Sequence, residues 1–155
     1  MTKLGILENQ VKTVYLGIGS NLGNRIANIE KAKYYETPSW PNPKNPKFIN
    51  IVLKVKCFLN SNELLDICKK IEVQLGRKKG PKNSPRECDI DIIDYNGLIL
   101  KDNLTLPHKL MHKRSFVLLP LFEIEKRWIH PVKKVDVKTL IFSLSNQDIR
   151  SIKQI

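Results

Sequence analysis

Two carboxylates spaced two residues apart are the clearest chemical signal in this sequence. Asp89 and Asp91 alternate with apolar residues in the stretch 88–93. Because side chains of a β-strand alternate between faces, both carboxylates would share one face, with Cα atoms roughly 6–7 Å apart. Carboxylates in this arrangement can hold Mg²⁺, whose remaining ligands are waters and substrate phosphates. The pattern predicts a magnesium site for phosphate chemistry, although an exposed polar face on a half-buried strand would look the same.

A basic segment leads directly into the carboxylate strand. Residues 77–86 begin with Arg77, end with Arg86 and contain three lysines between them. A planar guanidinium is well suited to binding phosphate oxygens through paired N–H donors. Carboxylates and guanidinium groups on one surface indicate metal-assisted phosphoryl chemistry.

The composition limits the possible partners. The chain has 155 residues, of which 41% are hydrophobic, and a net charge of +12. This charge fits a nucleotide, a nucleic acid or an acidic membrane, and a lysine-rich solvated surface would produce it equally well. No apolar run approaches the ~20 residues of a membrane helix, and residues 1–12 lack a signal-peptide core. We expect a cytoplasmic protein with a loose extension at 1–12 and one domain at 13–155.

The three cysteines predict neither a zinc knuckle nor a redox pair. Cys57, Cys68 and Cys88 are odd in number and widely spaced, without a Cys-x-x-Cys motif. Small buried thiols are the simpler interpretation for all three.

The elements that must position these groups follow from periodicity and turn residues. Residues 14–19 and 48–58 have strand patterns, and 24–33 has helical spacing. Four prolines in 38–47 exclude a regular helix and predict a loop. In the strand 48–58 one face is expected to hold Ile51, Leu53, Val55 and Cys57, and the other Asn50, Val52, Lys54 and Lys56.

A helix is predicted from Asn60 or Ser61 to Leu75, followed by Gly76 as a terminating residue. Its expected apolar stripe consists of Leu64, Cys68, Ile71 and Leu75.

An Asn-Gly turn is expected after the carboxylate strand. Asn96 and Gly97 both tolerate positive φ, so the sequence predicts a hairpin that pairs this strand with residues 97–100. Further helices are predicted at 114–119 and 137–144. Strands mixed with helices indicate an α+β fold, a ferredoxin-like α/β sandwich with a mostly antiparallel sheet.

Six separated motifs, taken together, carry a resemblance to a known family. They are 17–23 (GIGSNLG), 35–38 (YETP), 48–50 (FIN), 71–77 (IEVQLGR), 85–93 (PRECDIDII) and 106–121 (LPHKLMHKRSFVLLPL). In this order they resemble the 6-hydroxymethyl-7,8-dihydropterin pyrophosphokinases of folate biosynthesis. An ordered set across residues 13–131 is far more specific than any single motif.

The resemblance implies transfer of the β,γ-pyrophosphoryl group of ATP to the hydroxymethyl oxygen of the pterin, with AMP as the other product. It implies two Mg²⁺ ions, with ATP and 6-hydroxymethyl-7,8-dihydropterin as partners. We expect a monomer that binds no membrane and no nucleic acid. The residues that match the family's functional positions divide by role. They are the metal ligands Asp89 and Asp91, the catalytic Arg77 and Arg86, the ATP-binding Glu72, His108 and Arg114, and the pterin-binding Thr37, Pro38, Phe48, Asn50 and Phe116.

Several of these residues have simpler interpretations. Asn50 could merely begin a strand, and Phe48 and Phe116 could be ordinary core residues. His108 and His112 are four apart and could imitate a zinc pair, although no third ligand is evident. Trp40, in the proline-rich loop, could cover the pterin or simply pack.

The chain departs from the family pattern in two places. Lys82, Asn83 and Ser84 stand where the family often has an aromatic residue before Pro-Arg, so Trp40 or Lys82 could close the site instead. The segment between Leu22 and Thr37 is roughly fifteen residues shorter than the resemblance implies, where a crossover usually needs a dozen or more. A natural short form, a deletion or a gap in the recorded sequence would explain it, with the junction expected near residues 31–34.

Two alternatives to an active pyrophosphokinase remain. A basic ferredoxin-like domain could bind nucleic acid, although the aromatics do not cluster as stacking residues on one strand. An inactive short form of the enzyme would keep the fold and lose turnover.

Overall fold

The computed structural model describes residues 10–20, 34–39, 42–78 and 88–155. Five strands form an antiparallel sheet in the order β4-β1-β3-β2-β7. Their bounds are β1 Lys12–Ser20, β2 Tyr35–Thr37, β3 Phe48–Cys57, β4 Asp89–Tyr95 and β7 Lys153–Gln154. With its helices, this sheet confirms the predicted α+β, ferredoxin-like class.

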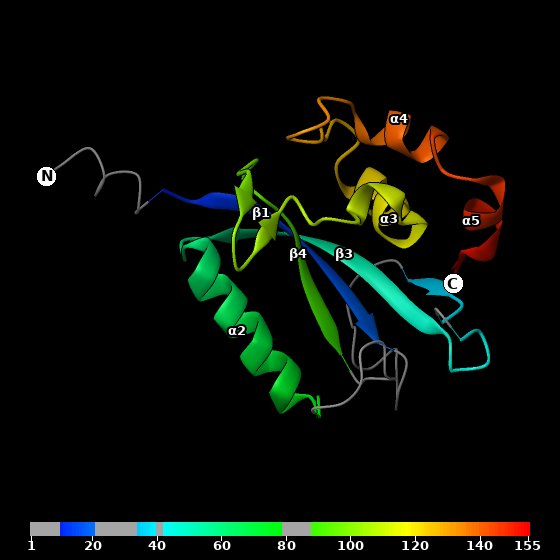
Figure 1. Cartoon of the computed structure of the whole chain (residues 1–155), viewed down its shortest axis with the longest axis horizontal. Helices are drawn as coiled ribbons and strands as arrows, with labels where there is room; N and C mark the ends of the chain where they lie inside the picture. Colours follow the sequence, from blue (N-terminus) through cyan, green and yellow to red (C-terminus); the bar gives the residue numbers. More distant parts are fainter. Residues whose placement is uncertain (1–9, 21–33, 40–41, 79–87) are drawn as a thin grey trace, which may run out of the picture.

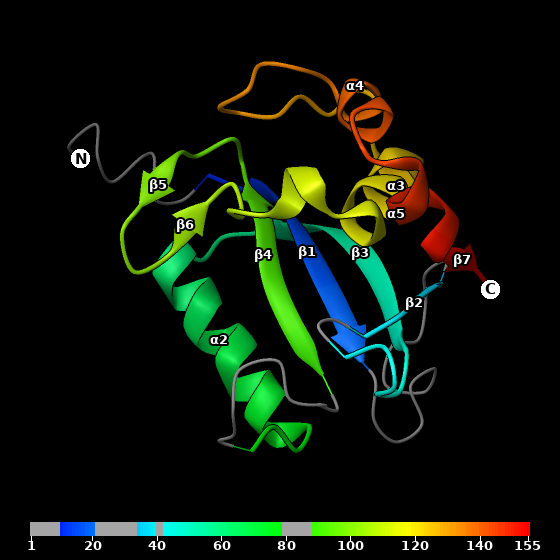
Figure 2. The same cartoon turned by 45° about the vertical axis from the view of Figure 1, so that its right-hand side comes forward.

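Helices cover both faces of the sheet. Helix α2 (Ser61–Gln74) lies on one side, and α3 (Ser115–Ile124), α4 (Val137–Phe142) and α5 (Asn146–Ser151) lie on the other (Figure 1). A second small sheet of β5 (Leu100–Lys101) and β6 (Thr105–Leu106) sits beyond the upper end of β4, above α2 (Figure 2). A short 3₁₀ turn, η2 (Met111–Lys113), leads into α3.

The period-two pattern of the strands divides the interior into two main cores. The α2 side collects Val14, Cys57, Leu64, Cys68, Cys88, Ile90 and Ile92. The α3 side collects Tyr15, Val52, Ile93, Leu118, Leu121 and Trp128. Because Asp89 and Asp91 alternate with Ile90 and Ile92, both carboxylates share one face, as predicted, and this face is on the α3 side. All three cysteines are free and buried, which confirms their predicted state.

Helix α2 begins and ends where the sequence predicts. Asn60 accepts hydrogen bonds from the backbone of Asn62 and Glu63, and the Glu63 side chain accepts from the Asn60 N–H, which makes a complete capping box. At the other end Gly76 takes φ +94°, and the Arg77 N–H reaches back to the Glu72 carbonyl. This is a Schellman ending, for which a residue with positive φ is needed.

The predicted apolar stripe of α2 is partly wrong. Leu64 and Cys68 are buried, but Ile71 and Leu75 are 38% and 41% exposed. The third buried position is Glu72, four residues after Cys68. A carboxylate occupies this position because α2 ends beside β4, where the groups around the side chain are polar and can form hydrogen bonds with it.

The predicted hairpin is correct in its turn and wrong in its pairing. Asn96 and Gly97 have φ of 50° and 72°, and the Leu98 N–H donates to the Tyr95 carbonyl. However, β4 pairs with β1, and the chain after the turn pairs β5 with β6. The inner edge of β4 is taken by β1, and on the outer edge the His108 N–H donates to the Ile93 carbonyl. The returning strand therefore has no room beside β4.

Other boundaries differ by smaller amounts. Strand β1 begins at Lys12, one residue inside the predicted extension. Helix α3 continues past Pro120 because its neighbours Leu118 and Leu121 are fully buried in the core. The sequence patterns did not predict α5 or β7. The predicted helix at 24–33 and the proposed junction at 31–34 lie outside the described residues.

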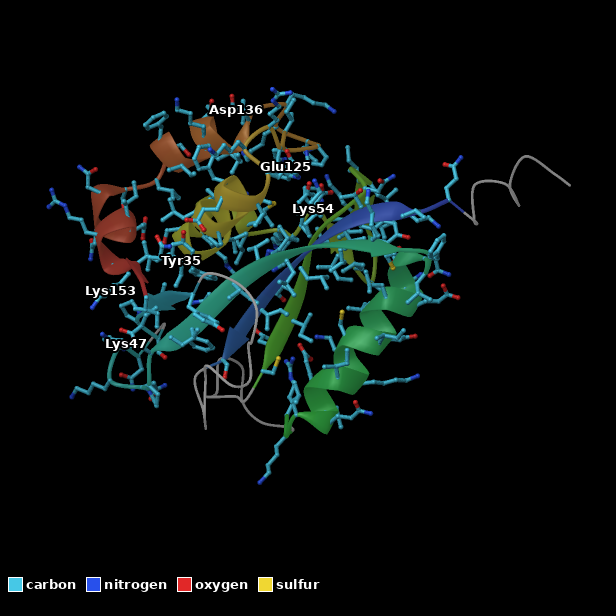
Figure 3. The ribbon with its side chains drawn as sticks, turned by 180° about the vertical axis from the view of Figure 1, so that it is seen from behind. Tyr35, Lys47, Lys54, Glu125, Asp136 and Lys153 are labelled. Atoms are coloured by element: carbon cyan, nitrogen blue, oxygen red, sulfur yellow. The ribbon has the colours of Figure 1, made fainter. Side chains whose placement is uncertain are left out.

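An ion pair joins α3 to the sheet. Lys54 of β3 and Glu125, just after α3, point toward each other with a nitrogen–oxygen distance of 2.5 Å (Figure 3). This pair holds the end of α3 over β3, next to the buried Tyr15. Among the described residues, no helix is both long enough and apolar enough to cross a membrane.

Candidate functional site

The strand register brings the two predicted binding regions onto the same face. Gly19 of β1 lies between Asp89 on β4 and Asn50 on β3, and Gly17 lies between Asp91 and Val52. Residues paired across an antiparallel sheet share a face, so Asn50 is on the side of the two carboxylates. The glycines leave a strip of bare backbone between these groups.

The glycine strip is a feature that sequence reasoning missed. A Cβ on Gly19 would lie 3.1 Å from Oδ1 of Asn50 and 3.5 Å from Cδ1 of Phe48. A side chain there would press on two residues predicted to bind the pterin. The signal was present as glycines at alternate positions of a strand, where glycine often marks a close approach by a ligand or another backbone.

At one end of the carboxylate pair, Asp89 contacts Arg77. Nη1 of Arg77 is 3.1 Å from Oδ1 of Asp89, and the same nitrogen donates to Oε2 of Glu72. The Asp89 and Arg77 side chains are about one-third exposed, whereas that of Glu72 is fully buried. The resemblance implied that Glu72 binds ATP; the structure instead places it behind Arg77, without exposed surface for a ligand.

At the other end, Asp91 faces two basic side chains. Oδ2 of Asp91 is 3.4 Å from Nη1 of Arg114 and 3.7 Å from Nε2 of His108. Burial lowers the pKa of His108, and the Asp91 carboxylate opposes that shift. The Arg114 guanidinium stacks 5.5 Å above the ring of Phe116, the predicted aromatic wall. The structure thus brings together four predicted residues from β4, from the two ends of the segment 108–114 and from α3.

The carboxylates fit a hard divalent cation. Both are side chains of one strand, both face the same way, and they are 30% and 37% exposed. No cluster of three or more His, Cys, Asp or Glu side chains able to hold a metal occurs in the described part of the chain. Mg²⁺ commonly binds through one or two carboxylates together with substrate phosphates, so this pair suits it.

The alternative zinc pair finds no support in the geometry. His108 faces Asp91, whereas the ring of His112 packs edge-on against His130 at 5.9 Å between centroids. The two imidazoles therefore have separate partners. Within the described residues neither belongs to a metal-ligating cluster.

Four of the five predicted pterin-binding residues lie at the β2–β3 end of the face, and the fifth, Phe116, is on α3 beneath the Arg114 guanidinium. Nδ2 of Asn50 donates to Oγ1 of Thr37 at 3.0 Å and to the carbonyl of Tyr35 at 3.4 Å. Asn50 and Thr37 are buried, Phe48 is half-buried and Pro38 is exposed. The Asn50 amide therefore uses its donor group to hold β2 and turns Oδ1 toward Gly19.

Three residues considered for the site cannot be placed. Arg86, Lys82 and Trp40 lie outside the described residues. Their roles stay predictions from the resemblance.

The comparisons with known proteins identify the family. Residues 15–126 match the family model described as 7,8-dihydro-6-hydroxymethylpterin-pyrophosphokinase. A 2-amino-4-hydroxy-6-hydroxymethyldihydropteridine pyrophosphokinase of Aquifex aeolicus is 40% identical over 141 residues, covering 81% of this chain and 88% of the relative. A relative of the same name from Methylorubrum extorquens is 34% identical over 127 residues, covering 71% and 80%.

Several similar relatives are much longer than this chain. The "Folic acid synthesis protein FOL1" of Dictyostelium discoideum is 40% identical over 148 residues, which cover 86% of this chain and 22% of that protein. The chain thus spans about a fifth of that relative and most of the Aquifex one. It belongs to the 7,8-dihydro-6-hydroxymethylpterin-pyrophosphokinase family. The predicted enzyme class, a pyrophosphokinase of folate synthesis, is confirmed.

The alignments also show that this chain has fewer residues than its relative within the matched region. The Aquifex match spans 141 positions but only 81% of the 155 residues, or about 126 of them. About 15 aligned positions therefore have no residue here. This deficit has the size of the shortening expected between Leu22 and Thr37, and its location stays a prediction.

Proposed function

We propose that this chain transfers the β,γ-pyrophosphoryl group of ATP to the hydroxymethyl oxygen of 6-hydroxymethyl-7,8-dihydropterin, releasing AMP. One observation carries the proposal: the acidic pair on β4 and Asn50 on β3 share a face, separated only by two glycines. A nucleotide and a flat heterocycle could then lie next to each other across the strip.

The triphosphate belongs at the β4 end. Asp89 and Asp91 would hold Mg²⁺, two ions in this proposal, which when bound neutralise phosphate charge and orient the triphosphate. Arg77, Arg114 and His108 surround the carboxylates, within hydrogen-bonding or ion-pair range of one or the other. Guanidinium groups can pair with the charge that develops on the transferred oxygens. Arg86 joins them in the proposal because it matches the family motif.

The pterin belongs at the β2–β3 end. Oδ1 of Asn50 faces the strip and can accept from the pterin's ring, while Thr37 is hydrogen-bonded to Asn50 and precedes Pro38 in the chain. Phe48 and Phe116 offer ring faces to a flat heterocycle. The Arg114 guanidinium over Phe116 links this wall to the carboxylates.

The transfer is an in-line displacement at the β-phosphorus. The hydroxymethyl oxygen forms a bond to the β-phosphorus, and the bond from that phosphorus to the α,β-bridging oxygen breaks, so AMP leaves with the bonding electrons. We assign no side chain as the base that takes the hydroxyl proton. Catalysis then depends on positioning and charge stabilisation.

The remaining assignments follow the same proposal. The working unit is the single domain 13–155, acting as a cytoplasmic monomer. Nucleic-acid binding is the less favoured alternative, because helices pack against both faces of the described sheet.

An assay for AMP formation tests the proposal. The chain is incubated with ATP and Mg²⁺, with and without 6-hydroxymethyl-7,8-dihydropterin, and AMP and pterin diphosphate are quantified. We expect equal amounts of both products, only when the pterin is present. A folded protein that forms neither product would be the inactive short form, and salt-sensitive RNA binding without turnover would favour the nucleic-acid alternative.

A further inference from the structure

Glu72 is a fully buried carboxylate at the end of α2, and no apolar side chain of the predicted stripe takes its place. Burying a charge is costly unless it is paired and hydrogen-bonded. The contacts of this carboxylate must therefore offset the free-energy cost of burying it. Its position directly behind the Asp89–Asp91 strand suggests what the contacts are for.

Glu72 holds two separate parts of the site. Oε2 pairs with Nη1 of Arg77 and lies 3.3 Å from Nζ of Lys69. Oε1 accepts a hydrogen bond of 2.8 Å from the backbone N–H of Ile90. Ile90 lies between the two candidate metal ligands, so the carboxylate grips both the guanidinium beside Asp89 and the backbone that carries the acidic pair.

The contact with Ile90 also provides a hydrogen-bond partner for the outer edge of β4. This strand ends the sheet, and its inner edge pairs with β1. An outward N–H of an edge strand needs a partner, and here a side chain from α2 provides it. The Schellman ending at Gly76 turns the chain so that Arg77 returns to the same carboxylate. Helix, turn and strand thus meet at one buried group.

We propose that Glu72 is a positioning residue for the transfer: it touches no substrate and holds both the Arg77 guanidinium and the acidic strand in place for the nucleotide. This inference rests on the proposed function. It replaces the direct ATP contact that the resemblance implied. A buried carboxylate that fixes a cation in advance reduces the reorganisation needed when phosphate charge develops.

The first test is Glu72→Gln, which keeps the size of the side chain and removes its charge. We expect kcat to fall about tenfold because Arg77 loses its fixed orientation, while KM for the pterin stays the same. Amide hydrogen exchange at Ile90 should become faster, because a neutral amide is a weaker acceptor. Glu63→Gln is the matched control: it makes the same change in α2, at the capping box, and should leave kcat and Ile90 exchange unchanged.

The second test is the double-mutant cycle with Arg77→Ala. If Glu72 acts through Arg77, Glu72→Gln costs no further kcat once Arg77 is gone. Arg77→Ala alone should lower Tm, because it strips the buried carboxylate of its closest cation, and adding Glu72→Gln should restore part of that Tm.

The outcomes separate this inference from the proposed function. Multiplicative losses of kcat without faster exchange at Ile90, or a Glu72→Gln enzyme with normal kcat, would overturn the positioning role. Arg77→Ala with the parent Tm would overturn it even if no Glu72 variant folds. If the parent chain forms no AMP, the proposed function fails, and the Tm and Ile90 exchange measurements still decide whether Glu72 holds Arg77 and β4.

Discussion

Two regions of the sheet hold their functional side chains by different means: the β4 edge, and the region of β3 and β2 next to the short outer strand β7, called the β2 edge. At the β4 edge, Asp89 and Asp91 sit among charged partners, with the buried Glu72 behind them. At the β2 edge, the side chains are held by hydrogen bonds between neutral groups: Asn50 donates to Thr37 and to the Tyr35 carbonyl. Hydrogen bonds to charged groups are stronger than neutral ones where they are buried, as at Glu72, whereas partly exposed ion pairs contribute little. The acidic edge is therefore anchored at its buried carboxylate, and the β2 edge by neutral hydrogen bonds.

The β2 edge depends on very short strands. Strand β2 has three residues and is covered on its outer side by the two-residue β7. The Ile155 N–H adds one bond to the Tyr34 carbonyl. Tyr35 lies beneath α3, with Lys47 and Lys153 farther out on the same edge (Figure 3). The difference suggests a nucleotide end that is set before binding and a pterin end that can adjust.

The largest expected effect comes from the charged edge. Asp91→Ala should reduce kcat by about 100-fold or more, because it removes a proposed metal ligand and leaves Arg114 and His108 without their shared partner. AMP formation measures it, with circular dichroism to establish folding. Asp66→Ala, an exposed carboxylate on α2, is the control and should keep full activity. Near-normal turnover in Asp91→Ala would contradict the metal role.

The neutral edge should respond in KM and not in kcat. Asn50→Ala removes the acceptor facing the strip and the donor that holds Thr37, so we expect KM for the pterin to rise about 10- to 100-fold. Affinity for a non-hydrolysable ATP analogue, measured by calorimetry, should change little. If the ATP analogue were lost as strongly as the pterin, the two edges would not be independent.

A pair of glycine substitutions sharpens the comparison at closer range. Gly19→Ala places a methyl group 3.1 Å from Oδ1 of Asn50, so we expect KM for the pterin to rise several-fold. Gly17→Ala is the matched control, because its methyl would meet the Ile93 side chain at 3.1 Å and the Asp91 carbonyl oxygen at 4.0 Å, and neither Asn50 nor Phe48. It should lower Tm slightly and leave that KM unchanged. Equal effects of the two variants on pterin KM would argue against the strip as the binding surface.

The smallest effect should come from the C-terminal strand. Deleting residues 153–155 removes the outer partner of β2, and we expect KM for the pterin to rise about threefold, with KM for ATP unchanged. Lys153→Ala keeps the backbone ladder and should behave like the parent chain. Steady-state kinetics with each substrate varied in turn would measure both constants. A rise in KM for ATP alone would show that β7 does not support the pterin end.

Local patterns predicted much of the site. The alternation around Asp89 and Asp91, the capping of α2 by Asn60 and the turn at Asn96-Gly97 depend on neighbours a few residues away, and all three are present. The pairing of β4 was mispredicted because a turn specifies its own geometry and not which strand fills the adjacent edge. The α2 stripe was mispredicted because Ile71 and Glu72 are adjacent, and a small rotation of the helix decides which one turns inward.

The sequence by itself determined the enzyme family, the shared face of the acidic pair and the ends of α2, because these depend on short-range periodicity and on an ordered set of motifs. Only the tertiary structure decided that β1 separates β4 from β3 and so places two glycines between the acidic pair and Asn50. It also decided that Glu72 points inward to Arg77 and Ile90. Both outcomes depend on strand order and on how α2 packs against the sheet. These are determined by contacts between residues that are far apart in the sequence.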